Sequence, residues 1–276
     1  MQDQKNRNLN YDRPVKIADD IFWVGFYDID SGLHCNPYLI VDGDEAVIID
    51  GGSRPDFPTV ILKILQAGVS PHDISTLIYQ HYDPDLCGSI SNFEDMINRN
   101  DLKILSHKSN NTFIRYYSVT APLLNIEDFD FTFEFSSGHK LEFTLTPYAH
   151  SPGSFITFDS KTGVLFTSDL FGSSSMEWDL FLSLSEECGT CTDYLHCPHG
   201  KSYCPLLDIL TFHTKIMPSE KALRYAMKQI EKIPYSIIAP QHGSVINDPN
   251  DSKIVIDHLL SAKGIGIDGI TARQKK

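Results

Sequence analysis

Apolar and polar residues follow strand-like patterns in two batches along the chain, and segments with helical spacing come after each batch. In the first batch, Tyr38–Val41 and Ala46–Ile49 flank Asp42-Gly43-Asp44, which is a typical hairpin turn. In the second batch, residues 141–145 alternate between apolar and polar, as in a strand with one buried face. We therefore predict two groups of strands, one from each half of the chain.

The other predicted strands and helices follow the same order, with strands first and helices after them. Further strands are predicted at Ile21–Phe26, Ile74–Tyr79, Leu102–Leu105, Phe131–Phe135, Phe155–Phe158, Val164–Thr167 and Tyr235–Ala239. Helices are predicted at Pro55–Ala67, Ser89–Asn98, Ser219–Lys232 and Asp251–Lys263. Two packed sheets with helices outside, an α/β fold, is the architecture that fits this order. Because no linker divides the chain, we expect one domain over residues 1–262 and a poorly ordered tail over residues 263–276.

Residues 172–217 show no clear periodicity and hold four of the six cysteines. An irregular connection of this length usually carries a function. Its thiols are Cys188, Cys191, Cys197 and Cys204, with His196 and His199 between them. Such spacing fits a structural zinc site or, less well, an iron–sulfur cluster. Free thiols or a labile disulfide are the alternatives.

Composition narrows the class of protein. The 276 residues carry a net charge of −13, which argues against a nucleic-acid partner because phosphate binding needs a basic face. No apolar run approaches the roughly 20 residues of a membrane helix. The polar N-terminus does not resemble a signal peptide. We therefore expect a cytoplasmic protein whose cysteines are thiols or metal ligands.

Four predicted strand ends each deliver histidine or aspartate side chains. They carry His81, Asp83 and Asp85 in the first segment, then His150, Asp169 and His242. Singly, each has a structural explanation, since Asp85 can cap a following helix and a lone histidine past a strand is usually structural. Together, so many charged groups at strand ends are costly unless a cation lies among them. The pattern therefore predicts a metal site.

This order of residues resembles the metallo-β-lactamase superfamily. The segment Val47–Gly52 is also similar to that family's second-strand motif, and the resemblance spans roughly residues 15–262. It implies an αββα sandwich with a two-metal site at one edge of the sheets. Hydrolytic members typically read His-x-His-x-Asp-His, whereas this chain has Asp83 at the second histidine. A carboxylate there is typical of the flavodiiron branch, and the narrower resemblance is to the oxygen-binding diiron proteins, which have no flavin domain.

The resemblance implies a ligand set of two non-haem irons, and a carboxylate-rich donor set suits iron. One metal would take His81, Asp83 and His150, the other Asp85 and His242, with Asp169 bridging both. The family's remaining histidine ligand is replaced here by Leu86, so the second metal has one protein ligand fewer.

The resemblance also implies partners. Dioxygen or nitric oxide would bind the irons, a homodimer is expected, and soluble chemoreceptors would receive a signal. The sequence contains no flavodoxin stretch and no glycine-rich phosphate loop, so we expect no FMN domain. Any reduction of oxygen would then need a separate electron donor.

Two other interpretations stay open. A metal-dependent hydrolase of the same fold would use metal-bound hydroxide on a phosphodiester, thioester or lactam. A degenerate scaffold without a metal has Leu86 as its only support. Around the site, candidate neighbours are Tyr82, Tyr148 and Phe171 as walls, Cys87 as a nearby thiol and His34 as a lining residue.

Overall fold

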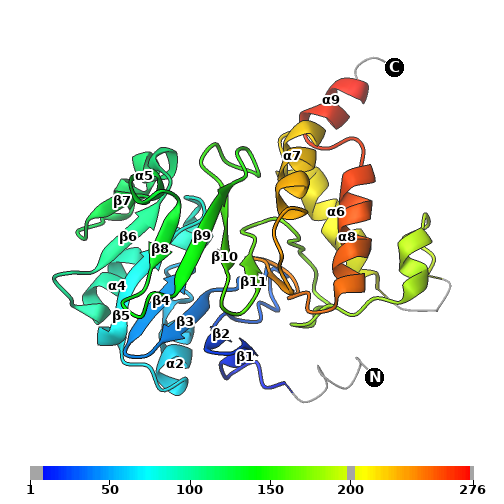
Figure 1. Cartoon of the computed structure of the whole chain (residues 1–276). Coiled ribbons are helices and arrows are strands. Elements are labelled where there is room, and N and C mark those ends of the chain that lie inside the picture. Colours follow the sequence, from blue (N-terminus) through cyan, green and yellow to red (C-terminus); the bar gives the residue numbers. More distant parts are fainter. Residues whose placement is uncertain (1–8, 198–202, 274–276) are drawn as a thin grey trace.

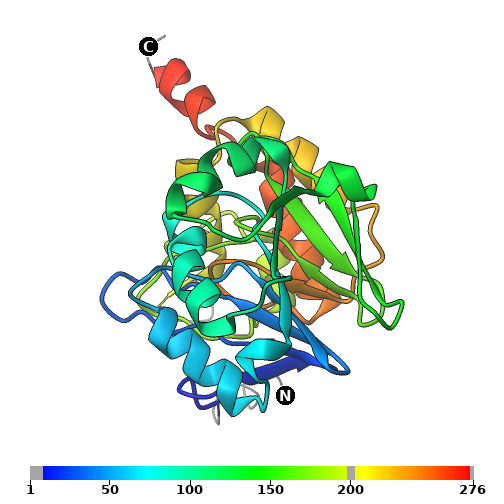
Figure 2. The same ribbon diagram turned by 90° about the vertical axis from the view of Figure 1, so that its left-hand side faces the viewer.

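Two β-sheets lie between layers of helices in the computed structural model, which describes residues 9–197 and 203–273 (Figures 1 and 2). Within these ranges the first sheet has seven strands, which follow one another in chain order. They are β1 (Val15–Ala18), β2 (Ile21–Trp23), β3 (Tyr38–Asp42), β4 (Glu45–Ile49), β5 (Ile74–Ile78), β6 (Lys103–Ser106) and β7 (Leu123–Asn125). The predicted hairpin is present, since β3 and β4 pair antiparallel with Asp42 opposite Glu45.

The second sheet comes from the other half of the chain. In the described residues its order is β12 (Ile237–Ala239), β11 (Val164–Phe166), β10 (Phe155–Asp159), β9 (Lys140–Leu145) and β8 (Thr132–Glu134). Strands β8 to β11 are antiparallel neighbours, whereas β12 pairs with β11 in parallel. The predicted two-sheet α/β architecture is therefore confirmed.

Helices cover the outer face of each sheet (Figure 1). Those on the first sheet are α2 (Phe57–Gln66), α4 (Ile90–Ile97) and α5 (Lys108–Ile114), with the single turn α3 (Pro84–Cys87) near its edge. Those on the second are α6 (Pro205–Ile216), α7 (Glu220–Ile230) and α8 (Pro249–Ser261), followed by α9 (Ile267–Arg273). The 3₁₀ turns are η1 (Pro71–Asp73), η2 (Arg115–Tyr117), η3 (Ile126–Phe129) and η4 (Glu186–Thr190). No helix in the described ranges has both the length and the apolar character needed to cross a membrane.

The strands alternate between two apolar layers. In β4, Val47 and Ile49 face the second sheet, while Ala46 and Ile48 face the helices. This follows from the two-residue period of a strand, and one strand therefore contributes side chains to two apolar layers. A third apolar layer lies between the second sheet and α6, α7 and α8. Both sheets are therefore buried on both faces over much of their length.

Two segments are more regular than the sequence predicted. Residues 172–217 were expected to be irregular, but α6 occupies Pro205–Ile216, where proline stands in the first turn of the helix. The tail over 263–276 was expected to be poorly ordered, but α9 forms within it. The tail docks through Ile267, whose backbone N–H donates to the Pro218 carbonyl at 3.0 Å. Both elements depend on such tertiary contacts, which a local pattern does not reveal.

Gln80 joins the two sheets next to the strand end that carries His81. Its buried side-chain amide donates to the carbonyls of Phe155 at 3.0 Å and Phe166 at 2.9 Å, on β10 and β11. Its backbone N–H donates to Asp50 Oδ1 at 2.9 Å. The first residue of the predicted metal loop is thereby fixed against the opposite sheet.

Replacing Gln80 with leucine tests this link. Gln80→Leu leaves two buried carbonyls without their donor, and we expect the free energy of unfolding to fall by about 2–4 kcal/mol. Urea denaturation measures the loss. Gln229→Leu, on the half-buried side of α7, is the control and should change stability by less than about 0.5 kcal/mol. Equal urea midpoints for Gln80→Leu and the unmodified protein would contradict this role.

Candidate metal centre

The four predicted strand ends meet at one edge of the two sheets. His81 follows β5, and Asp83 and Asp85 lie at the start of α3. His150 lies in the turn between β9 and β10, Asp169 follows β11 and His242 follows β12. Asp83, rather than Asp85, is the residue at the N-cap of the short helix, and its side chain makes no capping hydrogen bond. The structural explanation for these aspartates as helix caps is therefore not supported.

A first group forms around His150. Its Nε2 lies 3.0 Å from Asp169 Oδ2 and 3.4 Å from Asp83 Oδ2. The Nε2 of His81 lies 3.9 Å from the same oxygen of Asp83. One ligand atom from each of His81, His150 and Asp169 lies within 4.8 Å of the others. Donor atoms at such separations surround a point that each can reach.

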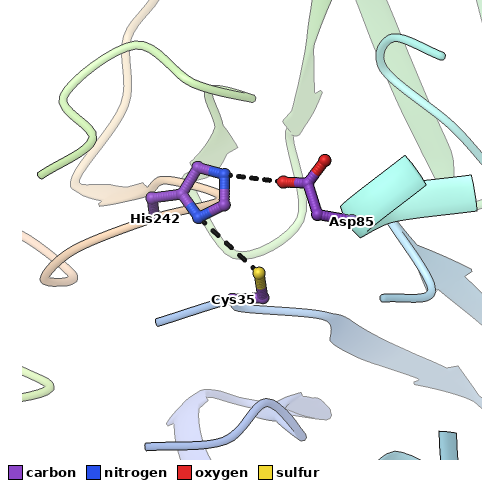
Figure 3. Close-up of side chains that lie close together, drawn as sticks. All are labelled: Cys35, Asp85 and His242. Atoms are coloured by element: carbon purple, nitrogen blue, oxygen red, sulfur yellow. Dashed lines mark hydrogen bonds and ion pairs between the residues drawn. The ribbon is translucent and has the colours of Figure 1, made fainter. Parts of the chain in front are cut away.

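A second group forms around His242 (Figure 3). Its Nε2 lies 3.0 Å from Asp85 Oδ2, while its Nδ1 faces the thiol of Cys35 at 3.7 Å. The two groups meet at Asp169, because its Oδ1 lies 3.8 Å from the Nε2 atoms of both His81 and His242. All six predicted residues are thus brought together, with Asp169 between two sets of donors.

Neighbouring groups orient two of the imidazole rings. His81 Nδ1 is hydrogen-bonded to Ser168 Oγ at 2.8 Å. His242 Nδ1 donates to the backbone carbonyl of His34 at 3.1 Å. With Nδ1 engaged, the Nε2 atom of each ring faces the centre, where it would be available to a metal after losing any proton, which is the arrangement of metal-binding histidines.

The electrostatics favour ionised carboxylates. Burial raises the pKa of Asp169, but the charges of His81 and His150 outweigh it and hold that pKa well below its usual range. Burial likewise raises the pKa of Asp85, but the hydrogen bond from His242 brings it below its ordinary value. Burial lowers the pKa of His150, yet the bond to Asp169 leaves it raised. A metal cation at the centre would stabilise the ionised carboxylates in the same way as the protonated histidines do.

Two buried atoms without hydrogen-bond partners also indicate that the residues at the sheet edge fit a metal. Among the described residues, His81 Nε2 and Asp169 Oδ1 are buried side-chain atoms without a hydrogen-bond partner. Each buried, unpaired polar atom costs about 1–3 kcal/mol. Both atoms are common metal-ligand types, and both face the shared centre. Imidazole and carboxylate donors suit divalent transition metals such as iron or zinc.

The turns that present these side chains have unusual backbone angles. Tyr148 has φ of +63° two residues before His150, and Ser168 has φ of +54° just before Asp169. Residues with side chains rarely adopt this left-handed region, and such residues cluster at functional sites. The turns therefore add to the evidence for a site at this edge.

Cys35 was not predicted as part of the site. Its segment runs beside the segment after β12, as Asn36 N–H donates to the Gln241 carbonyl at 2.8 Å, and this brings its thiol to His242. His34, the predicted lining residue, instead stacks its ring on Tyr27 and Trp178. No motif marks either contribution, because both depend on pairing between distant segments.

Leu86 and Cys87 are both fully buried in the apolar layer between the first sheet and its helices. Of the predicted aromatic walls, Tyr82 packs on Phe113, Tyr148 is exposed and Phe171 lies in the apolar layer of the second sheet. The aromatic ring beside His242 is instead Phe212 of α6, with ring centres 5.7 Å apart. The sequence did not mark Phe212, because it lies in the stretch predicted to be irregular.

The two sheets flanked by helices match the fold of metallo-β-lactamase-like proteins. Residues 33–243 match the model of a family described as "ODP family beta lactamase", and the chain belongs to this family.

Known relatives agree with this assignment. Diflavin flavoprotein A 1 of Synechocystis is 30% identical over 168 residues, which are 60% of this chain and 27% of the relative. The chain spans about a third of the length of the first curated relatives it matches.

Among solved structures, the apo state of the chemotaxis sensor ODP from T. denticola is similar with a TM-score of 0.73 and 23% identity, over 94% of this chain and 97% of the sensor. A structure described as the peroxy diiron species of chemotaxis sensor ODP is similar with a TM-score of 0.71 and 22% identity, over 94% and 99%. At these identities the similarity shows the fold.

The hydrogen bond from Ser168 to His81 gives a prediction about metal affinity. Ser168→Ala frees the His81 ring to rotate, and we expect affinity for a divalent metal to fall about 10- to 100-fold. Anaerobic calorimetric titration with cobalt(II) measures it. Ser236→Ala, which removes an exposed hydroxyl far from the site, is the matched control. An unchanged affinity in Ser168→Ala would show that the bond does not orient a ligand.

Proposed function

We propose that this protein binds two iron ions at the sheet edge and binds dioxygen there as an oxygen sensor. The observation that carries the proposal is the position of Asp169 between two sets of histidine and aspartate donors. His81, Asp83 and His150 would hold the first iron, Asp85 and His242 would hold the second, and Asp169 would serve both. When bound, the two irons supply the redox chemistry by which dioxygen is held.

The remaining residues hold and shield this centre. Ser168 and the carbonyl of His34 fix the rings of His81 and His242. Phe212 packs edge-on against the His242 ring, and apolar neighbours of this kind limit the access of water to a metal site. Gln80 fixes the loop of the first segment against the second sheet. The chain thus supplies ligands, their orientation and a partly apolar surround.

The sensor role rests on the comparisons. The chemotaxis sensor is matched over nearly its whole length, and one of its structures is described as a peroxy diiron species. The proposal includes a homodimer and a chemoreceptor that receives the signal. Nitric oxide is a second ligand for the same irons, and oxygen reduction with an external electron donor is the alternative activity. A hydrolase is less well supported, because Asp83 and Leu86 stand where imidazoles are expected.

Metal content and an optical spectrum test the proposal. Protein made anaerobically should contain about two irons per chain and gain a visible charge-transfer band on exposure to air. A band that persists without an electron donor supports a sensor, whereas rapid bleaching supports a reductase. Zinc in place of iron, with no spectral change in air, would contradict the proposal and favour a hydrolase.

Asp169→Ala tests the bridge. Because this carboxylate lies between both sets of donors, we expect its loss to reduce iron content from about two per chain to one or none and to abolish the band. Elemental analysis and the spectrum measure both effects. Asp101→Ala, which breaks an exposed ion pair with Arg99, is the control and should keep both irons. Two irons retained in Asp169→Ala would exclude a bridging role.

A further inference from the structure

Four thiols face one small cavity away from the metal centre. Cys188, Cys191, Cys197 and Cys204 line a space of about 30 Å³ together with Glu187, Asp193, Tyr194 and Leu206. All four cysteines are free thiols. They come from both sides of the segment 198–202, which lies outside the described residues together with His199. The cavity thus brings together four cysteines that are spread over 17 positions of the chain.

The first two thiols are arranged by a 3₁₀ turn. The N–H of Cys188 donates to the Ser185 carbonyl at 3.0 Å, and the N–H of Cys191 donates to the Cys188 carbonyl at 3.2 Å. In such a turn, side chains three positions apart project on the same side. The spacing C-x2-C therefore presents Cys188 and Cys191 as a pair, as in many zinc sites.

Cys204 faces this pair from the start of α6. It is the N-cap residue of that helix, and it lines the same cavity as Cys188 and Cys191. Four thiolates around one cavity would repel one another, and a divalent cation among them would remove that repulsion.

The surrounding structure holds the loop in place. His258 of α8 contacts the loop through both ring nitrogens, with Nε2 donating to the Cys188 carbonyl at 2.9 Å and Nδ1 hydrogen-bonded to Tyr194 Oη at 2.9 Å. Gly189 lies next to Ile254 on the same helix. The cavity is therefore built against α6 and α8 rather than on an isolated loop.

We propose that Cys188, Cys191, Cys197 and Cys204 bind one zinc ion as four thiolates. Binding releases four thiol protons to solvent and involves no change of oxidation state. The cavity of about 30 Å³ is small, which suits a single ion. Among the described residues, two groups of possible ligands have atoms within 4.8 Å of one another, and both lie at the sheet edge. The four thiols are farther apart than this, so zinc binding must draw them closer together.

The consequence is structural support for one wall of the metal centre. Cys204 is the N-cap of α6, and this helix carries Phe212, whose ring lies beside His242. It also carries His213, whose Nε2 accepts the N–H of Phe171 at 3.1 Å. Zinc would fix the first turn of α6 to the loop before it. The zinc site would stabilise the fold, and it would still bind zinc when the ligands at the sheet edge are removed.

The first experiment uses the full chain prepared under reducing conditions. We expect one zinc per chain with sulfur neighbours at about 2.3 Å in X-ray absorption. Cobalt(II) in its place should give intense thiolate-to-cobalt charge-transfer bands. Asp169→Ala should keep both signals, which separates this site from the sheet edge and from the proposed function. Zinc with only nitrogen and oxygen neighbours, or no bound zinc, would overturn the proposal.

Variants identify the ligands. Cys188→Ser and Cys204→Ser should each lose the cobalt–thiolate bands, weaken zinc retention against a chelator at least tenfold and make the loop more sensitive to proteolysis. Cys87→Ala removes a thiol outside the cavity, and His196→Gln alters an exposed ring of the same loop that pairs with Asp193, so both should keep the zinc.

Unchanged cobalt–thiolate bands in Cys188→Ser and Cys204→Ser would overturn the assignment. So would a brown protein with acid-labile sulfide, which indicates an iron–sulfur cluster. If the serine variants fail to fold, X-ray absorption and the cobalt spectrum of the unmodified chain still decide, since four sulfur neighbours per zinc support the site and fewer than three contradict it.

Discussion

The constraint on which the rest of this structure depends is the concentration of three carboxylates and three imidazoles at one sheet edge. Asp169 and His242 are almost fully buried, and Asp169 lies within 4 Å of three imidazole nitrogens. Moving such groups from water costs several kcal/mol each unless they are paired. In the metal-free chain, protons on the imidazoles balance the carboxylates, as the raised pKa values of His150 and His242 indicate. A pair of divalent cations would replace these protons, and the buried atoms of His81 and Asp169 that now lack partners would gain them.

The two-sheet architecture serves this constraint, because each donor begins at the end of a strand or its following turn. Side chains that converge from separate strands need those strands held in register, and buried hydrogen bonds between the sheets supply this. Gln80 joins β5 to β10 and β11, and Asn36 donates to the carbonyls of Pro240 and Gly243 beside His242. Each bond links the backbone next to one ligand with a distant segment. Loss of such a bond would therefore misplace ligands as well as lower stability.

The sequence was informative wherever a local pattern determines the structure. Alternating residues placed the strands, and histidines or aspartates just past apolar runs marked all six residues that now lie together, as Asp85 and His242 show at 3.0 Å. It was uninformative where the structure depends on distant contacts. Cys35 reaches His242 only because segments about 200 residues apart pair, and Ser168 orients His81 across the two sheets. Helix α6 was not predicted because it begins at Pro205, directly after a cysteine-rich stretch without clear periodicity.

The two sets of donors are unequal, and this bears on what the centre can do. The first set has His81, Asp83 and His150, whereas the second has Asp85 and His242, because Leu86 lies buried in an apolar layer and has no donor atom. A metal with fewer protein ligands keeps more positions for water or a small ligand. The thiol of Cys35 does not fill this gap in the manner of an imidazole, since it lies on the Nδ1 side of His242, opposite the atom that faces Asp85 (Figure 3). An ion held by the second set would therefore be the one at which a small ligand meets the least competition from the protein.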